Sequence, residues 1–427
     1  MVIRTLGCVL LACGASLAHP CAADGAPFAY IAKAGALLGL PGDVAVIDIA
    51  SNTVVATIAT SVVPNTTPFG VAVSPDGARV YVTDGSSVFA IRTATNTVIA
   101  TLSTGLGPNV RGVAVTPDGG RIYVAHRQST GTSGAVSAID TATFRVIATI
   151  SVGAQSIGVA TTPDGTRVYA TNQGANTVSV IGTATNGVTA TVAVGTSPFG
   201  VAITPDGTRA YVANSGSDNV SVIGTAGNTV MATIAVGRRP FGIAITPDGR
   251  RAYVANNGSG SVSVIDTATN AVTATIVTGA NPFALDVTAD GARVYATINN
   301  FVGPGNVSVI STATNTVTGT IAVAKPLALG KFITPPPGPP RDSANLIPMS
   351  PPDFPYKVTF EERCVESIGR LCLRTEIVRV CVGGNCFRPP PPPPPPICVR
   401  CALGGGLAAG AALGAIGAML LARRRRP

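Results

Sequence analysis

The sequence of 427 residues contains no tryptophan, and charged residues make up only 11% of it. No cysteine occurs between Cys21 and Cys364, and no glutamate occurs between residues 28 and 334. That central stretch has a single histidine, His126. Because zinc sites are built from several cysteine, histidine and carboxylate ligands, these absences argue against zinc there, and we predict no metal and no cofactor.

The charge of the chain is concentrated near its C-terminus. Residues 28–334 carry 16 Lys and Arg against 13 Asp, a net charge of +3, whereas residues 335–427 carry 12 against 6, a net charge of +6. The central stretch therefore lacks the basic surface of nucleic-acid-binding proteins. It also lacks tryptophan on which the bases of a single strand could stack, so a nucleic-acid partner is disfavoured.

A repeat with a period of about 42 residues fills the centre of the chain, and one copy begins SPFGVAITPDGTRAYVAN. The aspartate of its turn recurs with gaps of 42, 46, 42, 42 and 42 residues, at Asp76, Asp118, Asp164, Asp206, Asp248 and Asp290. Each copy contains four short β-type runs, and Asp-Gly joins the first two, which is typical of a hairpin. Four antiparallel strands in this length predict one blade of a β-propeller.

The tyrosines of the repeat count seven blades, at Tyr30, Tyr81, Tyr123, Tyr169, Tyr211, Tyr253 and Tyr295. The first copy has no opening strand, but residues 325–334 (KPLALGKFIT) resemble the opening run SPFGVAITP of the other copies. We therefore predict an all-β, seven-bladed propeller over 28–334, in which the C-terminal strand at 325–334 completes the first blade. Such closure leaves no unpaired strand edge at the seam.

Several short motifs carry a family resemblance: YVTD at Tyr81–Asp84, YATN at Tyr169–Asn172, and YVAN at Tyr211–Asn214 and Tyr253–Asn256. Together with the PDG turns and VSVID at Val262–Asp266, they resemble the YVTN-type β-propeller repeat family. The resemblance implies a seven-bladed ring in secreted, periplasmic or surface proteins, and it implies no single activity. Some relatives are adhesion-like surface proteins, some periplasmic members bind single-stranded DNA, and some seven-bladed rings are lactonase-like hydrolases.

In propellers of this kind, the loops that follow the second strands lie at one mouth of the central channel. The resemblance therefore places Asp84, His126, Asn172, Asn214 and Asn256 at one rim. It places a second series near them: Phe69, Arg111, Ile157, Phe199, Phe241 and Phe283. The asparagines either hydrogen-bond their own turns or contact a ligand, and the phenylalanines either form core or line a site.

Departures from the repeat give the candidate partner-binding residues. One blade has Arg111 in place of Phe, His126 in place of Asn, and an insertion of four residues. The candidates for a positive rim that binds an anionic ligand are Arg111, His126, Arg127, Arg238 and Arg239. Degeneracy of the repeat is the alternative explanation.

Each repeated Asp is followed three residues later by an Arg, which we interpret as turn chemistry; these are Arg79, Arg121, Arg167, Arg209, Arg251 and Arg293. No nucleophile elbow, phosphate loop, zinc-protease motif or calcium loop is found, so we predict no catalytic residues.

The N-terminus has the features of a signal peptide, residues 1–23, with cleavage after Ala18 or Ala23. Leu10-Leu11-Ala12-Cys13 resembles a lipoprotein cleavage box, which is an alternative.

The segment after the propeller is predicted to be a stalk and a membrane anchor. A Pro-rich linker (335–356) precedes a Cys-rich β module (357–388) and a polyproline rod (389–396). Residues 402–422 form an uncharged run long enough to span a bilayer, and 423–427 are a basic cytoplasmic tail. The candidates for disulfides are Cys364, Cys372, Cys381, Cys386, Cys398 and Cys401.

The layout of the tail resembles bacterial C-terminal sorting signals, which implies possible processing, and plain anchoring is the alternative. Gly406, Gly410 and Gly414 share one helix face and would allow pairing of this helix, although the ring itself is expected to be monomeric. The sequence thus predicts a non-enzymatic, exported, membrane-anchored propeller of the bacterial cell envelope, in the periplasm or at the cell surface. Its expected partner is an envelope or surface polymer or protein, and a lactonase-like hydrolase and a periplasmic DNA-binding propeller are the alternatives.

Overall fold

The computed structural model describes residues 27–34, 42–60, 67–103, 105–127, 133–300 and 305–335, and three strands at 358–368, 371–382 and 385–387. The chain divides into two compact units, Met1–Pro340 and Arg341–Pro427. The signal peptide, both proline-rich segments, the 402–422 run and Cys398 and Cys401 lie outside the described residues. No membrane-spanning helix is found in the part of the chain that the structure describes.

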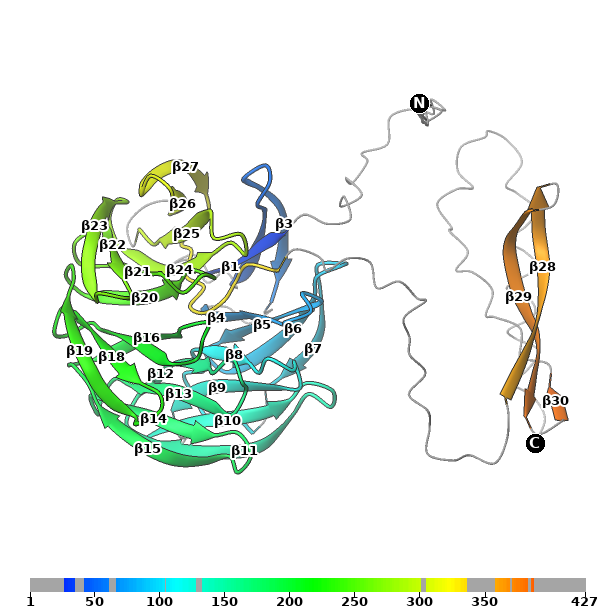
Figure 1. The fold of residues 1–427 in the computed structure, drawn as a ribbon, viewed down its shortest axis with the longest axis horizontal. Helices are drawn as coiled ribbons and strands as arrows, with labels where there is room; N and C mark the ends of the chain where they lie inside the picture. Colours follow the sequence, from blue (N-terminus) through cyan, green and yellow to red (C-terminus); the bar gives the residue numbers. More distant parts are fainter. Residues whose placement is uncertain are drawn as a thin grey trace, which may run out of the picture. The chain divides into compact units, whose positions relative to one another are not determined.

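The first unit is a ring of seven sheets around a central axis (Figure 1). The innermost strands of blades 2 to 7 are β4 (Pro68–Val73), β8 (Val113–Val115), β12 (Ser156–Thr161), β16 (Pro198–Ile203), β20 (Pro240–Ile245) and β24 (Pro282–Val287). The second strands of blades 1 to 7 are β1 (Phe28–Lys33), β5 (Arg79–Asp84), β9 (Arg121–Arg127), β13 (Arg167–Asn172), β17 (Arg209–Asn214), β21 (Arg251–Asn256) and β25 (Arg293–Ile298).

The two outer positions of each blade follow in the same order. The third strands are β2 (Asp43–Asp48), β6 (Ser87–Arg92), β10 (Gly134–Asp140), β14 (Thr177–Gly182), β18 (Asn219–Gly224), β22 (Ser261–Asp266) and β26 (Asn306–Ser311). The outermost strands are β3 (Thr53–Ala59), β7 (Thr97–Leu102), β11 (Arg145–Val152), β15 (Gly187–Ala193), β19 (Thr229–Ala235), β23 (Ala271–Val277) and β27 (Thr316–Ala322). The seven-bladed, all-β architecture predicted from the repeat is confirmed.

Burial follows the position of a strand in its blade. The second strands are buried almost throughout, and β17 exposes only part of Arg209. The outermost strands alternate between exposed and half-buried residues, and Val277 is 81% exposed. Alternation is expected where one side chain in two faces water, so the core of the ring lies between the inner three strands of neighbouring blades.

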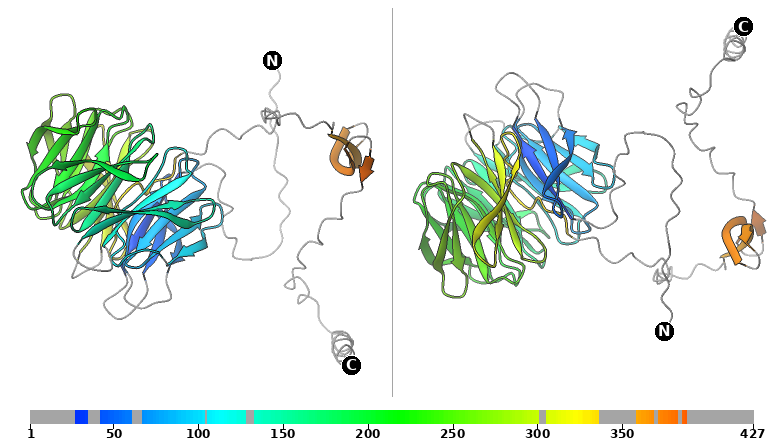
Figure 2. Two further views of the ribbon diagram at one scale, coloured as in Figure 1. Left: turned by 90° about the horizontal axis from the view of Figure 1, so that it is seen from below. Right: turned by 90° about the horizontal axis from the view of Figure 1, so that it is seen from above.

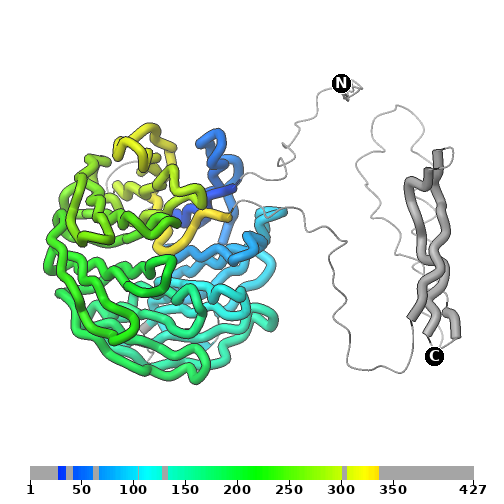
Figure 3. The backbone as a smooth tube through the Cα atoms, viewed as in Figure 1, coloured from blue at the N-terminus to red at the C-terminus, as the bar shows by residue number. Residues whose placement is uncertain are grey.

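The segment after β27 closes the ring, as the sequence predicts. Its backbone pairs with β1 through Tyr30 N to Phe332 O at 2.8 Å and Leu327 N to Ala32 O at 2.8 Å. The same segment bonds β4 on its other side, from Val71 N to Leu329 O at 2.9 Å. Figure 3 shows the closing segment as a yellow tube beside the blue β1, and Figure 2 shows the blue and yellow ends of the ring next to each other. It therefore takes the innermost position of blade 1.

Tyrosines join each blade to the next. Tyr211 in blade 5 donates its hydroxyl proton to Asn270 Oδ1 in blade 6 at 2.9 Å, and Tyr295 in blade 7 donates to Asn52 Oδ1 in blade 1 at 2.6 Å. The same bond occurs at every seam except that of Tyr81, where Phe144 replaces the asparagine and its ring stacks at 6.3 Å. Burial raises the pKa of Tyr211, so the hydroxyl stays protonated as a donor.

The arginine of the repeat, which blade 1 lacks, makes a second bond across the other six seams. Arg121 Nη1 donates to the carbonyl oxygen of Thr183 in the next blade at 2.7 Å, and Arg293 Nη1 donates to Ile49 O at 2.9 Å. The repeated aspartate stays within its own turn, as with Asp206, which accepts bonds from the Thr204 hydroxyl at 2.5 Å and the Thr208 amide at 3.0 Å. The hydroxyl bond holds the pKa of Asp206 below its usual value. Asp and Arg are thus turn and seam residues, not an ion-paired array.

The second unit is a three-stranded antiparallel sheet in the order β28 (Val358–Ile368), β29 (Leu371–Val382) and β30 (Asn385–Phe387). Its strands lie within the residues predicted to form the Cys-rich β module.

Candidate binding site at the channel mouth

A β-bulge in five inner strands contains the residue of the phenylalanine series, which is Phe69, Ile157, Phe199, Phe241 or Phe283. Pro198 pairs with Asn214, but the next inner partner is Val201, opposite Val212, so one extra residue stands between them. A bulge of this kind bends the strand and re-aims a side chain. The same shift occurs in β4, β12, β20 and β24.

The glycines that follow Phe69, Arg111, Ile157, Phe199 and Phe241 let the inner strands of adjacent blades touch, and Phe283 is followed by Ala284 instead. A Cβ on Gly200 would lie 2.4 Å from the carbonyl oxygen of Phe241, and one on Gly158 would lie 2.4 Å from that of Phe199. No real Cβ approaches an oxygen so closely, so only glycine fits at these two positions.

Four phenylalanines meet at the mouth and form what we call the aromatic plug: Phe69, Phe199, Phe241 and Phe283. The Phe199 and Phe241 rings stack at 4.4 Å, and Phe283 meets Phe69, Phe199 and Phe241 edge-on at 5.4 to 5.7 Å. Each ring is at least 92% buried. The interpretation of this series as core is confirmed, but the rings contact one another across the axis because their blades converge there.

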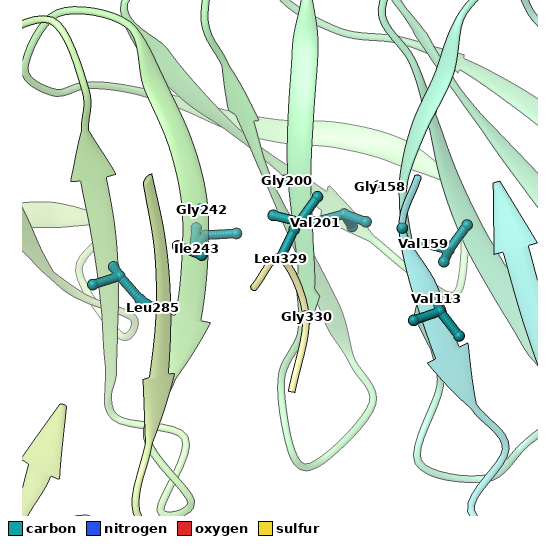
Figure 4. Close-up of a pocket in the computed structure, with 12 residues that line it drawn as sticks. Val113, Gly158, Val159, Gly200, Val201, Gly242, Ile243, Leu285, Leu329 and Gly330 are labelled. Carbon is teal, nitrogen blue, oxygen red and sulfur yellow. The ribbon is translucent and has the colours of Figure 1, made fainter. Parts of the chain in front are cut away.

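Little space remains in the channel beyond the plug. The pocket there has a volume of about 30 Å³, enough for roughly one or two water molecules. Figure 4 shows Val113, Val159, Val201, Ile243 and Leu285 on the inner strands, with Leu329 and Gly330 on the closing segment. None of the lining residues has a polar or ionisable side chain, so this pocket offers a ligand only backbone polar groups.

Two of the predicted rim arginines lie against the plug. The Arg111 guanidinium carbon is 4.7 Å from the centroid of the Phe69 ring, and that of Arg239 is 5.6 Å from the Phe241 ring. Both distances are within the range of cation–π attraction. Arg239 has a positive φ of 51°, and its backbone amide donates to Asp218 Oδ1 at 2.8 Å.

The other predicted arginines have different surroundings. Arg238 is exposed beside Arg239, and its amide donates to Ser259 Oγ at 2.7 Å. Arg127 ends β9, and its side chain lies outside the description.

Two residues at the mouth, Leu327 and Lys325, were not among the candidates taken from the sequence. Leu327, which is buried in the same core cluster as the plug, occupies the seventh position of the phenylalanine series. Lys325 precedes Pro326 with φ of 44°, as Arg239 precedes Pro240. Both residues could have been found from the alignment of residues 325–334 with the opening run of the repeat.

The three asparagines of the predicted rim are fully buried beneath the loops. Each donates from Nδ2 to a serine hydroxyl of the third strand at 2.9 Å: Asn172 to Ser179, Asn214 to Ser221 and Asn256 to Ser263. Each also packs under a loop glycine, and a Cβ on Gly195 would lie 2.7 Å from Asn214. This burial favours the turn-capping interpretation of the asparagines over ligand contact.

His126 and Asp84 occupy the position of these asparagines in two blades, and each is 1% exposed. His126 Nδ1 accepts from the Gly107 amide at 3.2 Å, and Nε2 lies 2.8 Å from Ser137 Oγ, so the neutral ring donates to the serine. Burial raises the pKa of Asp84. Both residues thus support the loops of the mouth from below, whereas Arg111 and Arg239 lie against the plug.

The arrangement can attract anions, because guanidinium groups pair with carboxylate, phosphate or sulfate oxygens in a bidentate geometry. Within the described ranges, no three His, Cys, Asp or Glu side chains gather as metal ligands would.

Comparisons with known proteins agree with this architecture. A family model described as a YNCE-like β-propeller matches residues 205–332. A second, described as lactonase, 7-bladed β-propeller, matches residues 71–233. These two matches support the assignment of the propeller to the YVTN-type β-propeller repeat family. No curated protein matches this YVTN-type propeller.

Two solved structures resemble the YVTN-type propeller. One is described as hydrazine synthase from Kuenenia stuttgartiensis, with 25% identity and a TM-score of 0.55, and the match covers 64% of this chain and 90% of that one. The other is described as a functionally unknown protein from Desulfotomaculum acetoxidans DSM 771, with 18% identity and a TM-score of 0.59, covering 70% and 98%. The second likeness concerns the fold alone.

Proposed function

We propose that this chain is a non-enzymatic, exported and membrane-anchored propeller that binds a partner at the mouth of its channel. The partner is an envelope or surface polymer, or a protein, that presents anionic groups. The observation that carries the proposal is the placement of the Arg111 and Arg239 guanidinium groups on a plug of four phenylalanines.

Physical chemistry supports binding rather than catalysis at this mouth. The plug fills the entrance with apolar rings, so a substrate has no path into the channel, but a flat or extended ligand can lie on the outside. Arginine that lies on an aromatic face keeps a defined orientation, which lowers the entropy lost when an anion binds. Asp218 adjoins this surface, where its carboxylate accepts a hydrogen bond from the Arg239 backbone amide at 2.8 Å.

Export and anchoring belong to the proposal on sequence grounds alone. The apolar N-terminus, the uncharged run at 402–422 and the arginines at 423–426 support them. Cell fractionation with and without protease treatment of intact cells tests this part separately.

The binding test uses the full chain and three probes: peptidoglycan, polygalacturonate as a carboxylate polymer, and single-stranded DNA. The test variant is Arg111→Ala with Arg239→Ala, and the control is Arg145→Ala, an exposed arginine at the start of β11. We expect retention of polygalacturonate or peptidoglycan that weakens at least about tenfold in the double variant and falls with salt. The control should bind as the parent does.

Equal loss in both variants, or retention of none of the probes, would contradict the proposed site. Retention of single-stranded DNA alone would instead favour the DNA-binding alternative.

A lactonase-like hydrolase is the second candidate, because the lactonase family model matches residues 71–233. Hydrolysis of simple lactones by the full chain, measured with and without added divalent cations, tests it. Turnover above that of buffer would overturn the non-enzymatic part of the proposal.

A further inference from the structure

Two cysteines of the second unit lie directly opposite each other in its sheet. In the pairing of β29 with β30, Cys381 faces Cys386, between the pairs Val380–Phe387 and Val382–Asn385. Only Gly383 and Gly384 separate the two strands in the sequence. A Gly-Gly dipeptide between paired strands is typical of a two-residue hairpin connection.

The position of this pair relative to the turn determines its geometry. The pair that closes a two-residue turn exchanges both backbone hydrogen bonds, and such pairs alternate with pairs that exchange none. Val382–Asn385 closes the turn, so Cys381–Cys386 is a pair without mutual hydrogen bonds. The Cα atoms of such pairs lie about 4.5 Å apart, which is within the range of about 4.4 to 6.8 Å that a disulfide spans.

The other two cysteines of the sheet, Cys364 and Cys372, do not lie opposite each other. Cys364 pairs with Thr375, and Cys372 pairs with Ser367, three residues further along the ladder. At about 3.4 Å per residue this offset is roughly 10 Å, beyond the reach of about 7 Å for a disulfide. The register therefore singles out one pair among the four cysteines.

We propose that Cys381 and Cys386 form a disulfide that closes the β29–β30 hairpin. A three-stranded sheet with strands of 11, 12 and 3 residues is a small unit, and covalent staples supply stability to units of this size. With glutathione disulfide as oxidant, a Sγ–Sγ bond forms and the bond of the oxidant breaks. The two thiol protons pass to the two glutathione thiols that are released.

In the cell, the bond rests on the export proposed above, because oxidising compartments preserve disulfides. The experiment is therefore done in solution, where its outcome is independent of the location of the protein. The full chain is oxidised with glutathione disulfide, alkylated under denaturing conditions and cleaved with trypsin and chymotrypsin. These enzymes release Val380–Phe387, which contains both cysteines and no others.

We expect this peptide to be unalkylated and lighter than its reduced form by two hydrogens. Reduction before alkylation should add two alkyl groups. The Cys372→Ser variant should leave the linkage intact, whereas Cys381→Ser should leave Cys386 open to alkylation or glutathione adduct formation. Alkylation of both cysteines in the oxidised parent, or a cross-link from either of them to Cys364, Cys372, Cys398 or Cys401, would overturn the proposal.

Discussion

The two faces of the ring differ in how strictly they keep the repeat. On the face of the Asp-Gly turns, the aspartate and the arginine recur in blades 2 to 7 and the tyrosine recurs in all seven. The aspartate bonds its own turn, whereas the arginine and, except at Tyr81, the tyrosine bond the next blade. On the face of the channel mouth, the residue type changes from blade to blade. The position of Phe199 is occupied by Phe, Ile, Leu or Arg, and the residues at the position of Asn214 include Asn, Asp and His. The first face is uniform and the second varies from blade to blade.

The uniform face contains the residues that bond one blade to the next, whereas the variable face contains residues that are specific to this protein. Bonds such as Tyr211 to Asn270 join neighbouring blades, so a change in any copy weakens a seam. Arg111 and Arg239 are outside this bonding pattern and lie on the plug, where a ligand could be met.

Substitution of a glycine in the inner strands should lower the stability of the ring more than the other changes proposed below. Gly200→Ala should lower the free energy of unfolding by about 3 kcal/mol, because its Cβ would lie 2.4 Å from the Phe241 carbonyl and the inner strands must separate. Chemical denaturation measures the change. The matched control is Gly319→Ala in β27, whose Cβ would meet no atom within 4 Å and which should be neutral or slightly stabilising. Equal destabilisation by both variants would show that close approach is not the cause.

The seam between blades 7 and 1 should depend on pH through Asp286. Its carboxylate accepts the amides of Phe332 and Ile333 at 2.7 Å, and Lys331 is the nearby positive charge. Burial raises the pKa of Asp286 to about 6 from the model-compound value of 3.8. The folded state therefore holds the proton more tightly, so this contribution is complete below pH 3.8 and is lost as pH rises through about 6.

We expect the free energy of unfolding to fall by about 2 to 3 kcal/mol over that interval because of Asp286. Asp286→Asn should remove this part of the pH dependence, as measured by denaturation at pH 4, 5, 6 and 7. A variant with the same pH profile as the parent would show that Asp286 does not titrate in this range.

The tyrosine seams allow a matched pair of substitutions. Tyr211→Phe should lower the free energy of unfolding by about 1 kcal/mol, because it leaves the amide of Asn270 without its donor. Tyr81→Phe should cost less, since Phe144 stands where the asparagine would be. Thermal denaturation of the two variants checks the difference, and a larger loss for Tyr81→Phe would contradict it.

One substitution should restore the tyrosine–asparagine bond at the Tyr81 seam, where Phe144 stands in place of the asparagine. Phe144 has φ of 51°, a conformation that asparagine adopts more readily than phenylalanine. Phe144→Asn should therefore raise the free energy of unfolding by about 0.5 to 1 kcal/mol, through lower backbone strain and a new bond from the Tyr81 hydroxyl. The gain should vanish in the Tyr81→Phe background if the bond is its main source. Denaturation of the double variant measures this coupling.

Much of the ring could be predicted from the sequence because each blade is a local unit. The Asp-Gly turns and the tyrosines fixed the number of blades, and the likeness of 325–334 to SPFGVAITP located the closing strand. The expectation that Arg111 and Arg239 lie at one mouth came from the resemblance to the repeat family. The period cannot show which side chains of different blades meet.

The contacts within the aromatic plug could not be predicted from the sequence. Phe69 and Phe199 belong to blades 2 and 5, and their rings are 6.2 Å apart only because the closed ring brings all inner strands to one axis. The burial of His126 likewise depends on the loop that contains Gly107, which covers it from the preceding inter-blade connection.

The sequence by itself determined the blade count, the order of strands and the closing segment, because turns and hairpins depend on residues near one another in the chain. Only the tertiary structure decided that the tyrosines and arginines bond the next blade, that the asparagines are buried, and that Asp286 holds the closing segment. The contacts of the tyrosines, the arginines and Asp286 join residues that are about 45 to 245 positions apart, and their partners are set by the closure of the ring.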